Sequence, residues 1–246
     1  MDQNKFKWTP EFWQGWRESD NPYRQYKSRR DRILALKLLD LQDGERVLEV
    51  GCGYGWISQA LWEAAKSDWF GVDRSAEMVC KLRRIRSSPC ATALVADAVH
   101  LPFGDRTFDK VLCTGVLMHI LDSDIAVREL VRVLRPDGRL VCSINNALSP
   151  YSLPAQLWNV RKKGFVQSFR SPRAFRKLLC AIGIDLEDVS GDGIVATVPL
   201  TIGKIQFPPL GAFPHVLKFD EWATNRWPLL AYELWFSGIK ARHCAS

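Results

Sequence analysis

Residues 46–55 read Arg-Val-Leu-Glu-Val-Gly-Cys-Gly-Tyr-Gly, an apolar run that ends in three alternating glycines, Gly51, Gly53 and Gly55. The first five residues are short, apolar and rich in valine, which is typical of a buried parallel strand. An amphipathic helix pattern follows from Trp56. Glycine suits the turn between them because it has no Cβ to block a ligand or a positive φ angle. The stretch therefore predicts a ligand-binding unit of strand, glycine turn and helix.

Composition indicates one soluble α/β domain. The chain has 246 residues, of which 47% are hydrophobic and 25% charged, as expected for a globular protein. Its polar start predicts no secretion signal, and no apolar run is long enough to cross a bilayer. The seven cysteines are scattered, with no C-x-x-C pair. We therefore expect a cytoplasmic protein with reduced core cysteines and no metal site.

The net charge of +7 comes largely from basic runs at 24–32, 81–86 and 161–177. Such runs are typical of solvated helix faces, but they also suit an anionic substrate, a nucleic acid or a membrane surface. None shows the repeated aromatic residues of a groove for single-stranded nucleic acid. We therefore expect no nucleic-acid partner, whereas peripheral membrane contact stays open.

Strand and helix patterns alternate from residue 46 to residue 144. Strands are expected at 46–50, 68–72, 92–96, 108–113 and 139–144, with a turn at 136–138 before the last of them. Two more are expected at 184–189 and 234–241, and helices at 56–65, 75–86, 123–134, 171–181 and 219–225. This alternation predicts an α/β fold with a doubly wound, seven-stranded, mostly parallel sheet.

The whole chain is expected to form a single domain, 1–246. Its N-terminal part, 1–40, is predicted to be a helical lid, with a turn at Asn21-Pro22 and a helix from Arg29 to Leu39. Residues 41–144 form the predicted cofactor-binding core. Residues 145–246 hold the last strands and two aromatic insertions on the substrate side.

Ligands of such sheets bind at the carboxyl ends of the strands. Those ends hold the glycine turn, Asp73, Asp97 and the segment 114–119. Asp73 follows Gly51 by about 20 residues, the separation expected of an acid that accepts hydrogen bonds from both ribose hydroxyls. Asp97 suits an adenine amino group, or it caps its own loop. The edge therefore predicts a cofactor that contains a nucleoside.

The turn also limits the kind of cofactor. Its spacing is G-x-G-x-G rather than the G-x-G-x-x-G of dinucleotide sites, and no Walker-type phosphate loop is present. Glu49, beside the turn, would repel phosphate and favour a cationic amino-acid moiety. S-adenosylmethionine has an ammonium and a sulfonium group and no phosphate.

Four segments in order resemble known proteins. They are Val47–Gly55, Gly71–Ser75, Asp97–Val111 with Leu101-Pro102-Phe103, and Glu129–Gly138, where Asp137 replaces the first glycine of the usual turn. They make residues 46–144 similar to the class I S-adenosylmethionine-dependent methyltransferases, specifically the type 11 methyltransferase-domain family.

The resemblance implies a Rossmann-like fold, S-adenosyl-L-methionine as cofactor and a role for each matched residue. The methionine end of the cofactor would be lined by Glu49, Gly51, Cys52 and Gly53. The ribose would bind Asp73, and the adenine would lie among Arg74, Met78, Asp97 and Ala98. Thr114 and Gly115 would lie near the transferred methyl group. The N-terminal helix would close over the cofactor, so that Tyr23, Tyr26 or Arg30 would contact its carboxylate.

His119, in Met118-His119-Ile120, is the candidate general base, since its unperturbed pKa is about 6.5. The alternative is a structural histidine. His215 is a second candidate, and His100 is expected to be solvated. Methyl transfer depends largely on alignment, because the sulfonium donor is already activated.

The acceptor site is predicted to be formed by three segments outside the matched core, 1–28, 145–170 and 191–232. The two insertions contain the aromatic residues Tyr151, Trp158, Phe165, Phe207, Phe213, Phe219, Trp222 and Trp227. These either line an apolar acceptor pocket, bury the insertions on the sheet, or form a membrane-surface patch. We predict methyl transfer to an oxygen or nitrogen of a small, partly apolar or aromatic molecule. The alternatives are a lipid or quinone methyltransferase at the membrane surface and an inactive, cofactor-binding partner subunit.

Overall fold

The sheet places the carboxyl ends of its parallel strands along one edge. In this computed structural model, which describes residues 11, 15, 20, 22–85, 91–150, 152, 168–194, 201–202, 205–206 and 214–242, seven strands follow the order β3-β2-β1-β4-β5-β10-β7. The pairs β1–β2, β2–β3, β1–β4 and β4–β5 are parallel, and β10 runs antiparallel between β5 and β7. The order reverses between β1 and β4, which is where ligands of such sheets bind.

The strands are β1 (Arg46–Val50), β2 (Asp68–Asp73), β3 (Ala91–Val95), β4 (Phe108–Cys113), β5 (Leu134–Asn146), β6 (Phe169–Arg170), β7 (Ile184–Asp192) and β10 (Glu233–Lys240). The helices are α2 (Pro22–Leu39), α3 (Ser58–Ala64), α4 (Ala76–Ile85), α5 (Ser123–Val133), α7 (Pro172–Ala181) and α8 (Pro214–Arg226), with short 3-10 turns η2 (Leu117–His119) and η4 (Pro228–Leu230). A two-stranded piece pairs β8 (Thr201–Ile202) with β9 (Ile205–Gln206).

The doubly wound, mostly parallel sheet is confirmed, and β1 and β4 have the predicted bounds. The sheet has an eighth member, β6, which pairs with β5. A strand of two residues is too short to leave a pattern in the sequence. The predicted turn at 136–138 lies within β5, where Asp137 has a φ of 61°.

Two predicted helix starts are wrong. Helix α2 begins at Pro22, not at Arg29, and α8 begins at Pro214, before the predicted Phe219. Proline fits the first turn of a helix because the N–H that it lacks has no partner there. The sequence prediction placed a turn at Pro22 and began the later helix five residues after Pro214.

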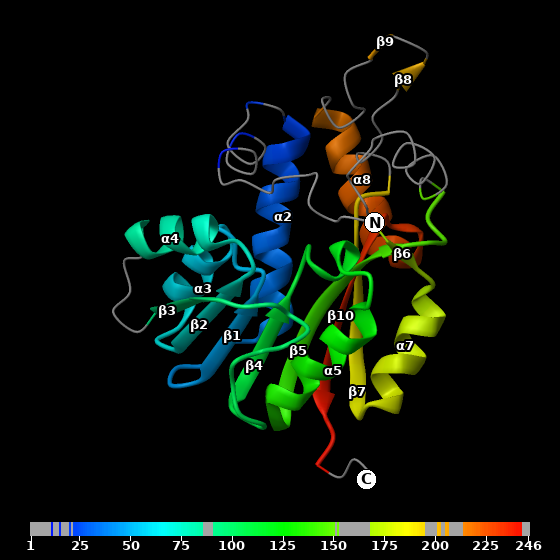
Figure 1. The fold of residues 1–246 in the computed structure, drawn as a ribbon. Helices are drawn as coiled ribbons and strands as arrows, with labels where there is room; N and C mark the ends of the chain where they lie inside the picture. Colours follow the sequence, from blue (N-terminus) through cyan, green and yellow to red (C-terminus); the bar gives the residue numbers. More distant parts are fainter. Residues whose placement is uncertain are drawn as a thin grey trace.

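Helices cover both faces of the sheet (Figure 1). Side chains alternate along β1, so that Val47 joins the core formed with α2, α3 and α4, whereas Leu48 joins the core formed with α5 and α7. No helix in the described part of the chain is long and apolar enough to cross a membrane.

A buried carboxyl group lies in the first of these cores. Glu49 is 4% exposed, and its Oε2 accepts hydrogen bonds from Ser58 Oγ at 2.7 Å and from Trp69 Nε1 at 3.2 Å. Burial raises the pKa of Glu49 to about 8, although these two hydrogen bonds oppose the shift. The group directly before the glycine turn is therefore largely protonated at neutral pH.

We predict that Glu49→Gln weakens the pH dependence of stability. The pKa of Glu49 rises on folding from 4.5 to about 8. The stability contributed by protonated Glu49 is therefore complete below pH 4.5 and is lost as the pH rises to about 8. The wild-type free energy of unfolding should therefore fall faster than that of Glu49→Gln, by up to about 1.4 kcal/mol per pH unit. Urea unfolding at several pH values between about 5 and 8 measures the difference. Equal slopes would contradict a protonated Glu49.

We also predict that Gly71→Ala destabilises the fold. A Cβ at Gly71 would lie 2.0 Å from Cη2 of Trp69, whose indole donates to Glu49. The ring would have to move, at a cost of about 1–3 kcal/mol in thermal or urea unfolding. Gly104→Ala is the matched control, because its Cβ would lie 3.6 Å from Thr107 Oγ1. Equal loss of stability in the two variants would contradict close packing of Trp69 on Gly71.

Candidate functional site

The three glycines of the turn have different roles. All have positive φ angles, of 76° at Gly51, 53° at Gly53 and 94° at Gly55. A Cβ would lie 2.0 Å from Val116 Cγ2 at Gly51 and 2.5 Å from Leu82 Cδ1 at Gly55, whereas at Gly53 it would meet nothing within 4 Å. Two glycines are thus required by packing, and Gly53 leaves backbone open to a ligand.

A second open glycine lies at the end of the neighbouring strand. Gly115 follows β4, has a φ of 70°, and a Cβ there would meet nothing within 4 Å. Its N–H donates to Ser143 Oγ at 3.0 Å, and Thr114 before it is half-buried. Because β1 and β4 are paired, both open glycines lie at the point where the strand order reverses.

Asp73 connects the glycine turn to the end of β2. Its Oδ2 accepts a hydrogen bond from Gly53 N at 2.9 Å, and its Oδ1 accepts one from Ser75 N at 2.8 Å. Burial raises the pKa of Asp73, and the two backbone hydrogen bonds oppose that shift. Each carboxylate oxygen keeps a second lone pair. Asp73 can therefore accept hydrogen bonds from two neighbouring hydroxyl groups while it fixes the turn.

The other predicted adenine contacts come from the two neighbouring strand ends. Asp97 is exposed, and its Oδ1 accepts from Val99 N at 3.2 Å, so it does cap its own loop. Ala98 and Met78 are buried, and Arg74 is exposed. Cys52 is also buried, so that it packs within the turn as a small residue.

His119 ends η2, which follows the Gly115 segment. It is half-buried, and its backbone N–H donates to Val116 O at 2.8 Å. Ser168 N donates to Met118 O at 2.7 Å, so the chain returns from the insertion directly onto this turn. His215, the second candidate base, is exposed, and His100 is exposed as expected of a solvated residue.

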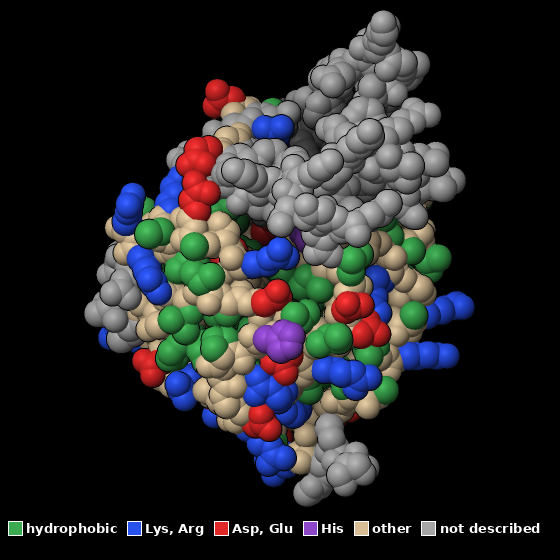
Figure 2. Space-filling view, viewed as in Figure 1, with side chains coloured by type: hydrophobic (Ala, Val, Ile, Leu, Met, Phe, Trp, Pro, Cys, Tyr) green, Lys and Arg blue, Asp and Glu red, His purple; other side chains and the backbone are tan. Residues whose placement is uncertain are grey.

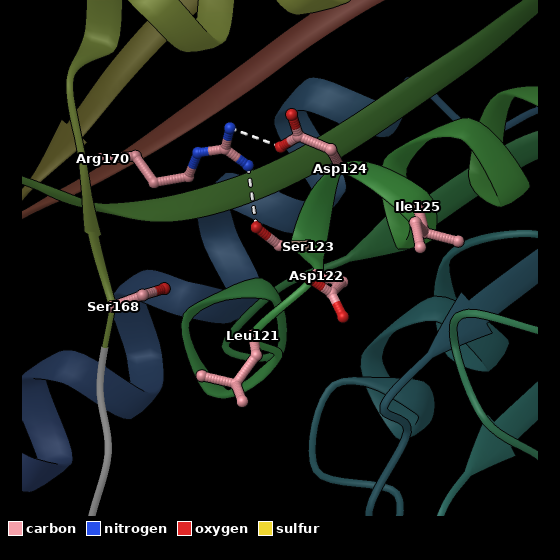
Figure 3. Close-up of a pocket in the computed structure, with 7 residues that line it drawn as sticks. All are labelled: Leu121, Asp122, Ser123, Asp124, Ile125, Ser168 and Arg170. Carbon is pink, nitrogen blue, oxygen red and sulfur yellow. Dashed lines mark hydrogen bonds and ion pairs between the residues drawn. The ribbon is translucent and has the colours of Figure 1, made fainter.

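A shallow pocket of about 380 Å³ lies where η2 leads into α5 (Figure 3). The Arg170 guanidinium points to the start of α5, where it donates to Ser123 Oγ at 2.8 Å and pairs with Asp124 at 2.5 Å. Apolar side chains are open beside it, since Leu121 is 68% and Ile125 50% exposed. Sequence reasoning missed this pocket, because Arg170 reaches α5 only through the β5–β6 pairing.

The predicted lid residues are engaged elsewhere in the fold. Tyr26 Oη donates to Asp220 Oδ2 of α8 at 3.3 Å, and burial raises the pKa of Tyr26. Arg30 is buried, donates to Gly191 O at 3.0 Å and pairs with Asp192 at 3.0 Å. Contact of either residue with a cofactor stays a prediction. Tyr23 lies in α2, but its side chain lies outside the described part of the structure.

An ion cluster holds α2 to the sheet. Lys27 Nζ lies 2.8 Å from both Asp192 and Glu233, and it also pairs with Asp31. The three carboxylates lie within 4.8 Å of one another. Burial raises the pKa of Asp192 to about 6, although Lys27 lowers it. Sequence reasoning missed the cluster, whose only local sign is the spacing of Lys27, Arg30 and Asp31.

Three of the predicted insertion aromatics lie at the surface. Phe219, Trp222 and Trp227 are 50%, 55% and 45% exposed, and successive ring centroids lie 5.6 and 5.3 Å apart. They are therefore not buried against the sheet. The predicted aromatics at 151, 158, 165, 207 and 213 lie outside the described residues.

Basic side chains on the face shown in Figure 2 are spread out and alternate with acidic ones. This pattern fits solvated helix faces more closely than one continuous basic patch on that face.

The sequence around this edge is similar to that of known methyltransferases. Residues 48–142 match a family model described as a methyltransferase domain. The methyltransferase GfsG of Streptomyces halstedii is 38% identical over 109 residues, which are 42% of this chain and 38% of that protein. The malonyl-[acyl-carrier protein] O-methyltransferase of Erwinia billingiae is 34% identical over 114 residues, 46% of this chain and 44% of that protein. The chain thus matches about two fifths of the length of these curated relatives.

Solved structures share the fold over most of the chain. An S-adenosylmethionine-dependent methyltransferase from Mesorhizobium loti has a TM-score of 0.63 at 18% identity, covering 87% of this chain and 98% of that one. Magnesium protoporphyrin IX methyltransferase from Synechocystis, solved with bound S-adenosylhomocysteine, has a TM-score of 0.62 at 17% identity and covers 89% and 86%.

The matched domain includes the glycine turn, Asp73 and the β4 edge, and the sheet has the topology of these enzymes. Residues 48–142 therefore form a methyltransferase domain, and the chain has the fold of class I S-adenosylmethionine-dependent methyltransferases.

Proposed function

We propose that the protein transfers a methyl group from S-adenosylmethionine to an oxygen or nitrogen of a small, partly apolar organic molecule. The observation that carries the proposal is the Asp73 carboxylate, held between Gly53 N and Ser75 N at the end of β2. A ribose has two adjacent hydroxyl donors, and the remaining lone pairs of Asp73 provide two acceptors for them.

The residues of the edge fit this cofactor. Gly53 and Gly115 lack a Cβ where open space adjoins their backbone, so a nucleoside can approach closely. The segment 49–55 contains no basic side chain that could bind a phosphate. Its acid, Glu49, is buried and neutral, so the segment suits a cofactor without phosphate. In this proposal Met78, Asp97 and Ala98 contact the adenine. The bound cofactor would supply a methyl group activated by the sulfonium charge.

The protein itself would align the acceptor and accept a proton. We assign proton acceptance to the His119 imidazole, because η2 follows the Gly115 segment and is held by the returning insertion at Ser168. A phenol or hydroxyl acceptor benefits from such a base, whereas a neutral amine need only be presented unprotonated. The pocket beside η2 combines exposed Leu121 and Ile125 with the Arg170–Asp124 pair, which supports an acceptor with an apolar body and a polar group.

A second candidate is methylation of a lipid or quinone at a membrane surface. Phe219, Trp222, Trp227, Leu229 and Leu230 are all more than two fifths exposed. Contiguous exposed aromatic and aliphatic side chains are found on proteins that bind membranes peripherally.

Product formation separates these possibilities. The chain is incubated with methyl-labelled cofactor and soluble phenols, carboxylic acids and amines, and in parallel with quinone-loaded anionic vesicles. Label in a soluble acceptor supports the first candidate, and label only in vesicles supports the second. Cofactor binding without label in either would contradict both and favour an inactive partner subunit.

We predict that Asp73→Ala weakens binding of S-adenosylhomocysteine at least about tenfold, or about 1.4 kcal/mol, because the ribose loses its acceptors. Isothermal titration measures the affinity. Asp68→Ala, at the exposed start of the same strand, is the control and should bind normally. Asp73→Asn, which keeps one acceptor oxygen, should fall between. Unchanged affinity in a folded Asp73→Ala would overturn the ribose assignment.

We predict that His119→Ala lowers kcat about 10²-fold on a phenol or hydroxyl acceptor, with S-adenosylhomocysteine affinity retained. Replacement of the exposed His100 by Ala is the control and should leave both quantities unchanged. Rates are measured as product per enzyme with the acceptor found above. Near-normal turnover of His119→Ala would make His119 structural.

A further inference from the structure

A groove between α2 and α3 lies outside the site described above. The two helices lie side by side on one face of the sheet (Figure 1), and the groove encloses about 520 Å³. That volume lies within the range of sites for small organic ligands. The groove is lined by Gln25, Ser28, Arg29, Arg32, Ile33, Leu36, Trp56 and Ala60.

The groove carries positive charge. Arg29 and Arg32 are the charged residues among the described side chains that line it, and none of those side chains is acidic. The acid of α2 nearest to them in sequence, Asp31, is buried in the ion cluster with Lys27. A ligand in the groove would therefore meet cations that no lining carboxylate neutralises, which favours an anion.

The same groove has apolar walls. Ile33 is 49% exposed although it lies on a helix that packs against the core. Trp56 forms the wall opposite Ile33, and Arg32 holds it in place. The Arg32 guanidinium lies 4.0 Å from the Trp56 ring centroid, and its Nε donates to Trp56 O at 3.2 Å. This rigid pair of a planar cation and an indole suits a flat apolar body.

Ser28 provides an independent sign of a ligand. It is 3% exposed, lines the groove, and its Oγ has no hydrogen-bond partner among the described residues. A serine hydroxyl within a helix can bond to a carbonyl of the preceding turn, and leaving it unpaired in a buried position is unfavourable. Rotation of the Ser28 side chain into another staggered rotamer would present this hydroxyl to a carboxylate oxygen in the groove.

We propose that this groove binds an aromatic carboxylate, with the carboxylate at Ser28 and Arg29 and the ring against Trp56 and Ile33. The site is distinct from the edge formed by Gly53, Asp73 and Gly115, and the proposal does not depend on methyl transfer. Because Trp56 directly follows the glycine turn, the ligand would bind beside the cofactor and not in its place.

The test uses isothermal titration of the full chain with naphthalene-2-carboxylate, and with naphthalene-2-methanol as the neutral counterpart. The carboxylate should bind with one-to-one stoichiometry, and the alcohol about tenfold more weakly or not at all. Arg29→Gln should weaken carboxylate binding about tenfold. The matched control is Lys37→Gln, an exposed cation of α2 outside the groove, which should bind as the wild type does. Thermal melts check that both variants fold.

Two further measurements locate the site. Ser28→Ala should weaken the carboxylate and leave the alcohol unchanged, and saturating S-adenosylhomocysteine should leave carboxylate affinity unchanged. The proposal is overturned if the wild-type chain does not bind the carboxylate. It is also overturned if Arg29→Gln and Lys37→Gln lose affinity equally, or if S-adenosylhomocysteine displaces the probe.

Discussion

The hydrogen bond from Gly53 N to Asp73 Oδ2, 2.9 Å long, joins the two parts on which the candidate site depends. It holds the turn after β1 against the end of β2, while Ser75 N holds the other carboxylate oxygen at the start of α4. The positive φ at Gly53 presents the N–H to Asp73 and leaves the other side of the backbone open. One carboxylate thus both builds the site and remains able to bind a diol.

The layers around this bond keep it in place. Below it, Trp69 lies over Gly71 and donates to Glu49, so that a buried neutral acid fills the space under the turn. Beside it, Gly51 packs against Val116, which ties the turn to the segment after β4. The Lys27 cluster holds α2 against the ends of β7 and β10. The position of the turn therefore results from contacts with the ends of two neighbouring strands, β2 and β4.

The sequence predicted those parts that depend on local pattern. The bounds of β1 and β4 were predicted correctly because continuous apolar runs and glycines mark fully buried strands. The spacing of Asp73 from the turn placed it at the end of β2, where it contacts Gly53. Contacts between distant segments could not be predicted. Lys27 meets Asp192 and Glu233, and Arg170 meets Asp124, only because the chain folds back on itself. The α2–α3 groove was not predicted for the same reason, because in the sequence Arg29 and Arg32 are only part of a basic run.

The arrangement of Gly53, Asp73 and Gly115 suits a nucleoside cofactor that has a cationic amino-acid moiety and no phosphate. Isothermal titration of the full chain with S-adenosylmethionine, and separately with NAD⁺, tests it most directly. We expect one-to-one binding of S-adenosylmethionine and no measurable binding of NAD⁺. Binding of NAD⁺ with equal or higher affinity, or failure of a folded chain to bind S-adenosylmethionine, would contradict it.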